Sequence, residues 1–224
     1  MPDRAVIFDL DGTLVDTAPD LMHATNHVLE SLGRRAISMA EVRAFVGHGA
    51  RALVTRGLAA TGGLPENYDV EPDYRRFVDY YSRNIAEGSQ PFPGLIPLLD
   101  RLKSEGYGLG VCTNKLEGLS VQLLDALHLS SYCGSVVGPD TLGVAKPDPK
   151  PFFEAVSRLR LDSPRAIMVG DSETDILTAR NAGVPVLAVP FGYTPRPVSE
   201  FGPDRMIRHF DDAYDAIQEL FALA

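Results

Sequence analysis

Short apolar runs alternate with amphipathic stretches along most of the chain beyond residue 108. The apolar runs have the length and composition of buried strands. They are found at 5–8, 109–112, 135–137, 166–169 and 184–189. Stretches with helical spacing are found at about 116–127, 150–159, 173–182 and 211–222. Alternation of strands with helices is typical of a parallel sheet covered on both faces, so the pattern predicts an α/β fold.

The pattern changes between residues 17 and 90, where helical spacing replaces the alternation. One apolar stripe ends before Gly33 and contains Leu21, Ala24, Val28, Leu29 and Leu32. Further helix-like segments are found at 40–46, 50–61 and 72–87. We expect no strand among them.

A helical block that interrupts an α/β pattern after its first strand indicates an insertion. We therefore expect an inserted helical cap at 17–91 and a core formed by 1–16 and 92–224. The hinges between the two are expected near Val15–Ala18 and Phe92–Gly94.

The charge balance excludes some classes of partner. The chain has 21 Lys plus Arg against 30 Asp plus Glu, a formal charge of −9, and no dense basic tract, so nucleic-acid binding is not expected. It has no run of 18 apolar residues and no signal-peptide pattern, which predicts a cytoplasmic protein without a membrane partner. Cys112 and Cys133 lack metal-type spacing and are expected to be reduced. The oligomeric state cannot be derived from these features.

Two acids, Asp9 and Asp11, follow the first predicted strand in the stretch VIFDLDGTLVD. Residues two apart in extended chain point the same way, so both carboxylates are expected to face one crevice. Gly12 then allows a sharp turn. A lone D-x-D-G is also compatible with an ordinary polar strand end. The residues after the other strands are therefore needed to distinguish a functional site from such an end.

Further polar residues follow other predicted strands. Thr113 and Asn114 follow one strand, Asp171 follows another with Asp175 four residues on, and Lys146 lies in the loop GVAKPDPKPF. Ligands of open parallel sheets bind at the carboxyl ends of the strands. We therefore expect acids for a cation, together with a lysine and short donors for an anion.

Each of these signals has a simpler explanation when it is taken alone. Thr113 and Asn114 could cap the helix that follows them. Ser172 and Asp175 match a capping pattern, which would still leave Asp171 unexplained. A lysine in a Pro-rich loop is usually a solvated surface charge. The joint occurrence of the motifs in this order favours a functional site.

Taken together, the motifs resemble those of the haloacid dehalogenase superfamily, phosphatase branch. DLDGT resembles the first motif, TN the second, Lys146 the third and GDSETD the fourth. The resemblance implies a Rossmann-like three-layer α/β/α core with a parallel sheet and a helical cap inserted after the first motif. It also implies that Asp9 is the nucleophile that becomes an aspartyl phosphate, while Asp11 protonates the leaving oxygen and then activates water. Lys146, Thr113 and Asn114 would hold the phosphate oxygens.

The same resemblance implies a Mg²⁺ site. The ion would be held by Asp9, the backbone carbonyl of Asp11 and Asp171, with Asp175 as direct or water-mediated support. Hard oxygen ligands with retained waters suit this ion. Mg²⁺ would relieve the repulsion between the acids and neutralise phosphate charge.

The segments LVDTAPDL and FVGHGARALV most resemble phosphoglycolate phosphatases, which implies 2-phosphoglycolate as the small-molecule phosphate ester. Gly47 and Gly49 would let the backbone approach a ligand, and the helix that begins near Ala50 would direct amides toward an anion. Gly49 and Arg51 are the candidates for substrate specificity, with Arg51 binding a carboxylate. Alternatively, the loop is only a turn and Arg51 a surface charge. His48 has no assigned task.

Other functions share the core motifs. A sugar-phosphate phosphatase or a β-phosphoglucomutase-like isomerase would differ only in the cap. Asp11 argues against dehalogenation, and the absence of a cap lysine argues against a phosphonoacetaldehyde hydrolase, because the first lysine is Lys103. A non-catalytic binding module on the same fold would not need Asp9, Asp11, Lys146 and Asp171 together.

Overall fold

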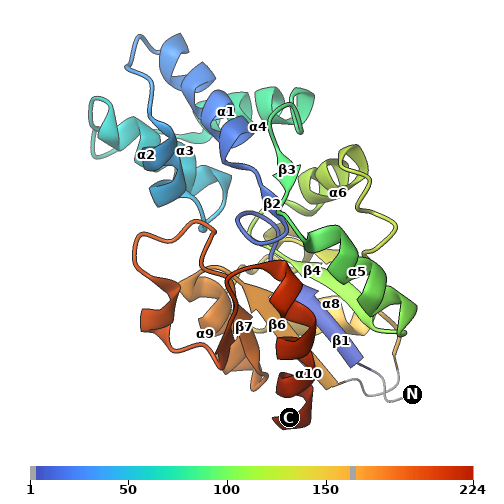
Figure 1. The fold of residues 1–224 in the computed structure, drawn as a ribbon. Helices are drawn as coiled ribbons and strands as arrows, with labels where there is room; N and C mark the ends of the chain where they lie inside the picture. The colour runs from blue at the N-terminus through green and yellow to red at the C-terminus, as the bar shows by residue number, and fades with distance from the viewer. Residues whose placement is uncertain (1–3, 162–164, 224) are drawn as a thin grey trace.

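The computed structural model describes residues 4–161 and 165–223, and a parallel sheet forms the centre of this part of the chain. Six strands pair in the order β5-β4-β1-β6-β7-β8, and every pair in this sheet is parallel (Figure 1). The strands are β1 (Arg4–Phe8), β4 (Gly108–Cys112), β5 (Ser135–Val137), β6 (Arg165–Gly170), β7 (Val186–Ala188) and β8 (Arg205–Met206). The first motif follows β1, which lies between β4 and β6 inside the sheet.

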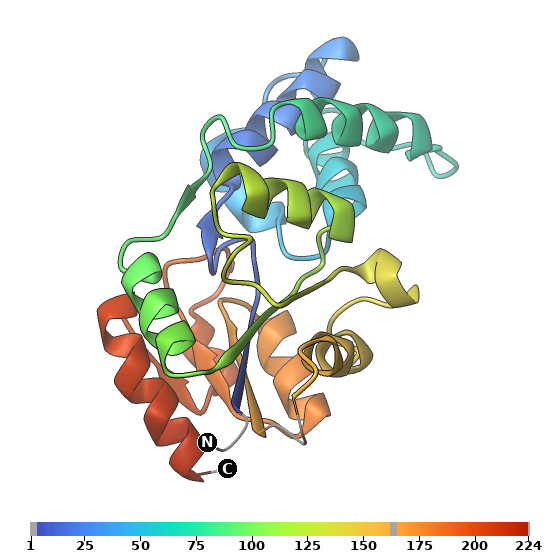
Figure 2. The same ribbon diagram turned by 90° about the vertical axis from the view of Figure 1, so that its right-hand side faces the viewer.

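Alternate side chains of β1 enter two separate hydrophobic clusters, one on each face of the sheet. The helices around the sheet are α5 (Leu95–Ser104), α6 (Glu117–Ala126), α7 (Pro139–Leu142), α8 (Lys150–Arg158), α9 (Glu173–Ala182) and α10 (Ala213–Leu223), with short 3₁₀ turns η1 (Val198–Phe201) and η2 (Phe210–Asp212). Val6 and Phe8 belong to the cluster that contains residues of α5 and α10, whereas Ala5 and Ile7 belong to the cluster that contains residues of α8 and α9. Figure 2 shows the helices on both sides of the sheet, so the predicted three-layer α/β/α core is confirmed.

Four helices form the segment between β2 (Val15–Asp16) and β3 (Gln90–Pro91), which we call the cap segment. They are α1 (Ala18–Ser31), α2 (Met39–Phe45), α3 (Ala50–Ala60) and α4 (Glu71–Arg83). Figure 1 shows them beyond the carboxyl end of the sheet. The predicted stripe of α1 is buried except for Leu32, which follows the helix and is 39% exposed. The boundaries of a cap domain at 17–91 stay a prediction.

Several short elements escaped the sequence pattern. β2 and β3 pair antiparallel, with Val15 opposite Pro91 and Asp16 opposite Gln90. β2 lies within the first range expected for a hinge, whereas β3 ends one residue before the second. The expectation of no strand between 17 and 90 was therefore wrong at its edge, because two-residue strands have no periodicity to detect. Helix α5 was missed because proline and glycine surround its start, but Pro97 lies in its first turn, where no amide donor is needed.

Two expectations about the whole chain can also be compared with the structure. Cys112 and Cys133 are free thiols, as expected. Among the described helices, none has the length and apolar character needed to span a bilayer.

Candidate active site

The loop after β1 brings Asp9 and Asp11 to the same cavity, as their spacing predicted. The Leu10 amide donates to Asp9 Oδ1 at 2.7 Å, and the Leu10 carbonyl accepts from the Val15 amide at 3.0 Å. Gly12 has a φ of 88°, and a Cβ there would lie 2.8 Å from Asp171 Oδ2. Both its conformation and the close approach of a carboxylate therefore require glycine at this turn.

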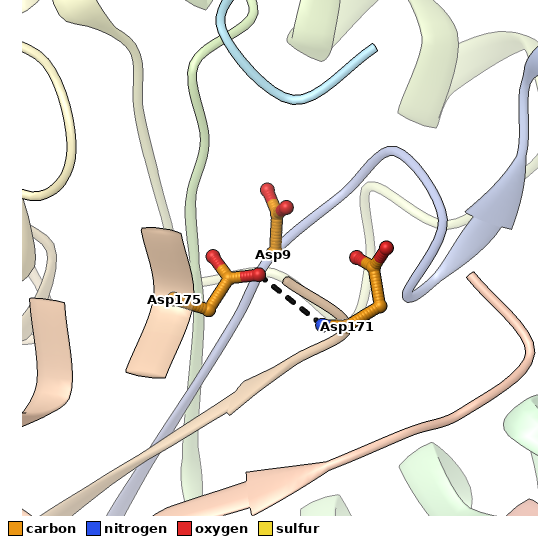
Figure 3. A group of neighbouring side chains, drawn as sticks. All are labelled: Asp9, Asp171 and Asp175. Atoms are coloured by element: carbon orange, nitrogen blue, oxygen red, sulfur yellow. Dashed lines mark hydrogen bonds between the residues drawn. The ribbon is translucent and has the colours of Figure 1, made fainter. Parts of the chain in front are cut away.

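Asp171 lies directly after β6 and joins Asp9 and Asp175 in a buried cluster, in which one oxygen of each carboxylate lies within 4.8 Å of the others (Figure 3). Thr13 Oγ1 donates to Asp171 Oδ1 at 2.8 Å. The Tyr193 amide donates to Asp171 Oδ2 at 2.6 Å. Asp171 is therefore oriented by residues from two different loops.

Asp175 is the N3 residue of α9 and forms the capping box with Ser172 that the sequence suggested. Its Oδ2 accepts from the Ser172 hydroxyl at 2.7 Å and from the Asp171 amide at 3.2 Å, the bond drawn in Figure 3. Its Oδ1 accepts from Lys146 Nζ at 2.6 Å. Asp175 thus caps the helix and also positions two other site residues, and both of its oxygens already have protein donors.

Lys146 is buried beside these acids, so the alternative of a solvated surface charge was wrong. Its Nζ lies 2.9 Å from Asp9 Oδ1 and 2.6 Å from Asp175 Oδ1. Burial alone would lower the pKa of Lys146, but the charges of Asp175 and Asp9 outweigh burial and raise it. Lys146 therefore provides a fixed positive charge at Asp9.

Lys115 is a site residue that the sequence reasoning missed. Its Nζ lies 2.7 Å from Asp11 Oδ1 and 2.9 Å from Asp11 Oδ2, and Thr17 Oγ1 donates to the same carboxylate at 2.7 Å. Lys115 directly follows Asn114 at the end of β4, and this position was the signal that could have identified it. Each acid of the first motif therefore has its own lysine.

Thr113 and Asn114 do not cap the following helix, because α6 begins at Glu117 and its N-cap residue has no side-chain hydrogen bond. Thr113 is buried, and its hydroxyl accepts from the Lys115 amide at 3.2 Å. Asn114 Oδ1 accepts from the Lys146 amide at 2.9 Å, and Nδ2 donates to the Gly47 carbonyl at 3.1 Å. Asn114 therefore joins the third-motif loop to the cap segment, while the predicted phosphate contacts of both residues stay predictions.

The cap loop lies over the same cavity. Gly49 is the N-cap of α3 with a φ of 83°, and a Cβ there would lie 3.0 Å from the Asn114 carbonyl. Arg51 pairs with Glu71, and its guanidinium carbon lies 4.4 Å from the Tyr74 ring centroid. Its side chain is 55% exposed, so the residue expected to bind a substrate carboxylate already has an acidic partner at the surface.

The cavity between the strand ends and the cap segment has a volume of about 190 Å³. The sheet contributes polar side chains, and the cap segment contributes mainly apolar ones. The polar lining residues from the first and second motifs are Asp9, Asp11, Thr113, Asn114 and Lys115. Pockets for drug-sized ligands measure roughly 300–1,000 Å³, so this cavity suits a small molecule.

The site carries an excess of negative charge. Burial raises the pKa of Asp9 to about 7, opposed by Lys146 and supported by Asp175. Burial, followed by the charges of Asp175 and Asp9, raises the pKa of Asp171 well above its ordinary range.

The donor set fits a divalent metal ion. Four acids meet at this site: Asp9, Asp11, Asp171 and Asp175. Within the described part of the chain, only two ammonium groups pair with them, those of Lys115 and Lys146. Two negative charges are left over when all four acids are ionised. A hard divalent cation would balance them and would match the carboxylate oxygens.

Comparison with known proteins identifies the family to which this site belongs. The model of the haloacid dehalogenase-like hydrolase family matches residues 6–189. The chain belongs to this family. Haloacid dehalogenase-like relatives include the phosphoglycolate phosphatase of Mesorhizobium japonicum, 45% identical over 92% of this chain and 91% of the relative. The phosphoglycolate phosphatase of Caulobacter vibrioides is 47% identical over 92% of this chain and 87% of the relative.

A solved structure of similar architecture comes from Haemophilus somnus and is described as a predicted phosphoglycolate phosphatase. It has a TM-score of 0.88 and 30% identity, and covers 96% of this chain and 98% of its own. These findings confirm the haloacid dehalogenase-like family, the Rossmann-like fold and an enzyme of the phosphatase type. The alternative of a non-catalytic binding module is therefore set aside, while the roles of individual residues stay predictions.

Proposed function

We propose that this protein is a Mg²⁺-dependent phosphatase that hydrolyses 2-phosphoglycolate through an aspartyl phosphate on Asp9. The observation that carries the proposal is that Asp9 and Asp11 reach one small cavity with different partners. Asp9 lies 2.9 Å from Lys146 Nζ, and Asp11 lies 2.7 Å from Lys115 Nζ. The two acids therefore have separate ammonium partners and can take separate tasks, attack on phosphorus by Asp9 and proton transfer by Asp11 once Lys115 has moved away from it.

In the first half of the reaction, a carboxylate oxygen of Asp9 attacks phosphorus. A new bond forms between Asp9 and phosphorus while the ester P–O bond breaks. Asp11 gives its proton to the leaving oxygen, so glycolate leaves as an alcohol. Asp11 has to exchange its contact with Lys115 for one with the ester oxygen in this step.

In the second half, Asp11 takes a proton from a water molecule. The water oxygen bonds to phosphorus while the bond to Asp9 breaks, so inorganic phosphate leaves and Asp9 is regenerated. Lys146 holds Asp9 in place throughout, and the Thr113 hydroxyl lines the cavity where it can donate to a phosphate oxygen.

Asp9 and Asp171 are the side chains that would hold the metal ion. Asp175 supports them, because its oxygens already accept from Lys146 and from the Ser172 hydroxyl. When bound, Mg²⁺ would supply positive charge that lowers the repulsion between Asp9 and the phosphate oxygens.

The choice of 2-phosphoglycolate rests on two observations. The cavity of about 190 Å³ favours a small ester over a hexose phosphate. The two bacterial relatives named above are phosphoglycolate phosphatases that share 45% and 47% identity with this chain.

The test is a phosphate-release assay with 2-phosphoglycolate, hexose phosphates and p-nitrophenyl phosphate, each with Mg²⁺ and with excess EDTA. We expect the highest kcat/KM with 2-phosphoglycolate, and no release in EDTA. A higher kcat/KM with hexose phosphates would instead identify the protein as a sugar-phosphate phosphatase. Release from none of the esters, or full activity in EDTA, would overturn the proposal.

A further inference from the structure

The carboxylate of 2-phosphoglycolate needs a binding partner close to Asp11. A single methylene carbon separates this carboxylate from the ester oxygen that leaves. The group that binds the carboxylate must therefore lie next to the acid that protonates that oxygen. This requirement rests on the proposed function, and it directs attention to the neighbours of Asp11 rather than to the outer cap loop.

Lys115 fulfils this requirement better than Arg51. The Lys115 side chain is 6% exposed and lines the cavity, with Nζ in contact with both oxygens of Asp11. The Arg51 side chain also lines the cavity, but it is 55% exposed and pairs with Glu71. A buried ammonium without competing water interacts more strongly with an incoming carboxylate than an exposed guanidinium does.

Tyr81 supplies a second donor at the same place. It projects from α4, lines the cavity and is 1% exposed. Its hydroxyl has no hydrogen-bond partner among the described residues, although buried polar groups are normally satisfied. The Lys115 Nζ lies 4.7 Å from the centroid of the Tyr81 ring.

Burial raises the pKa of Tyr81 to about 12, so at neutral pH the hydroxyl keeps its proton and can donate it in a hydrogen bond. An unused buried donor beside a buried ammonium is the arrangement expected where an anionic ligand completes the hydrogen bonding.

We propose that Lys115 and Tyr81 form the subsite that binds the substrate carboxylate. The Lys115 ammonium shifts from Asp11 to the carboxylate, and the Tyr81 hydroxyl donates to the same group. Substrate binding thereby weakens the contact between the Lys115 ammonium and the Asp11 carboxylate. Arg51 keeps its pair with Glu71 and its place at the rim.

The test compares 2-phosphoglycolate with ethyl phosphate, which has the same chain length without the carboxylate, for the wild type and Tyr81→Phe. We expect Tyr81→Phe to lower kcat/KM for 2-phosphoglycolate roughly ten- to a hundred-fold, with ethyl phosphate changed by less than about two-fold. Tyr80→Phe is the matched control, because Tyr80 is the preceding residue of α4 and does not line the cavity. It should change neither substrate.

Two further variants separate the alternatives. Lys115→Met should reduce both reactions, because it also removes the partner of Asp11, but it should reduce turnover of 2-phosphoglycolate more. If Arg51→Ala shows the selective loss and Tyr81→Phe does not, the subsite is wrong and Arg51 binds the carboxylate.

The melting temperature of each variant serves as the control for correct folding. Tyr81→Phe removes a hydroxyl that has no hydrogen-bond partner of good geometry among the described residues, so its melting temperature should stay close to that of the wild type. Equal losses on both esters in a folded Tyr81→Phe would overturn the subsite but leave the phosphatase intact. A wild type that hydrolyses ethyl phosphate but not 2-phosphoglycolate, or neither ester, would overturn the proposed substrate or the proposed function, and the subsite with it.

Discussion

At the scale of single residues, the partners of each acid determine what it can do. Asp9 and Asp11 are separated by one residue, yet Asp9 contacts Lys146 and Asp11 contacts Lys115. Asp9 also belongs to the carboxylate cluster with Asp171, whereas Asp11 is held by Thr17 from the start of the cap segment. The loop at Gly12 thus divides two chemically identical side chains between two environments.

Asp9→Asn should abolish phosphate release while the protein stays folded. The amide keeps the shape of the side chain, but it is neither a nucleophile nor an anionic partner for Lys146. Phosphate release and circular dichroism measure the two effects. The phosphate mimic BeF₃⁻ should attach to Asp9 in the wild type, and turnover by the variant would mean that another group attacks phosphorus.

At the scale of elements, the junction between the cap segment and the sheet is stabilised by polar contacts. The buried carboxylate of Asp20 on α1 accepts from the Gly88 amide at 2.9 Å and from the Ser89 amide at 2.8 Å. It therefore joins the first helix of the cap segment to the residues that directly precede β3, next to the paired strands β2 and β3.

Asp20→Ala should lower the free energy of unfolding by roughly 2–4 kcal/mol, because it leaves buried amides without an acceptor. The melting temperature should fall by about 5–15 °C. Asp215→Ala on the exposed face of α10 is the control and should change stability by less than about 0.5 kcal/mol. Equal stability of the two variants would show that Asp20 does not hold the junction.

Tyr193 connects the junction to the acid cluster. Its amide donates to Asp171 at 2.6 Å, while its hydroxyl accepts from the Ala18 amide at 2.9 Å and donates to Asp16. Arg43 Nη2 in turn lies 2.8 Å from Asp16 Oδ2. One residue, through its backbone amide and its side-chain hydroxyl, therefore contacts both the residue that follows β6 and the start of the cap segment.

Tyr193→Phe should raise KM several-fold with a smaller effect on kcat, because the cavity walls come from both sides of the junction that the hydroxyl stabilises. The contact to Asp171 uses the backbone amide, so the Mg²⁺ concentration for half-maximal activity should stay unchanged. Steady-state kinetics at varied ester and varied Mg²⁺ measure both. A shift in the Mg²⁺ requirement without a change in KM would contradict this separation.

At the scale of the whole molecule, the site unites parts of the chain that are distant in sequence. β1, β4 and β6 lie side by side in the sheet, so the residues that follow them meet at one edge. The cap segment covers this edge and completes the cavity. The result is a concentration of acids whose mutual repulsion a bound cation would relieve.

Mg²⁺ should therefore stabilise the folded wild type. A ligand at a hundred times its Kd contributes about 2.7 kcal/mol, which corresponds to a rise of about 5–10 °C in the melting temperature of a chain of this size. Asp171→Asn should remove most of this rise, whereas Asp215→Asn should keep it. Melting curves with Mg²⁺ and with EDTA give the comparison, and an unchanged rise in Asp171→Asn would locate the ion elsewhere.

The sequence by itself determined the features that depend on local pattern. The period of apolar residues predicted five of the strands of the parallel sheet and the core helices α6, α8, α9 and α10, but not α5. The two-residue spacing predicted that Asp9 and Asp11 share a cavity. The capping box of Ser172 and Asp175 was also readable, because its partners lie three residues apart. Each of these features is local: its partners lie within a few residues along the chain.

Only the tertiary structure decided the partners of the polar side chains. Lys115 meets Asp11 across 104 residues, and Asn114 meets the Gly47 carbonyl across 67. Arg51 pairs with Glu71 of the next helix, and no local pattern in the sequence joins these two residues; its predicted role as a substrate ligand stays a prediction. A hydrogen bond requires atoms to meet within about 3 Å, and over such separations only the packing of the whole chain sets that distance.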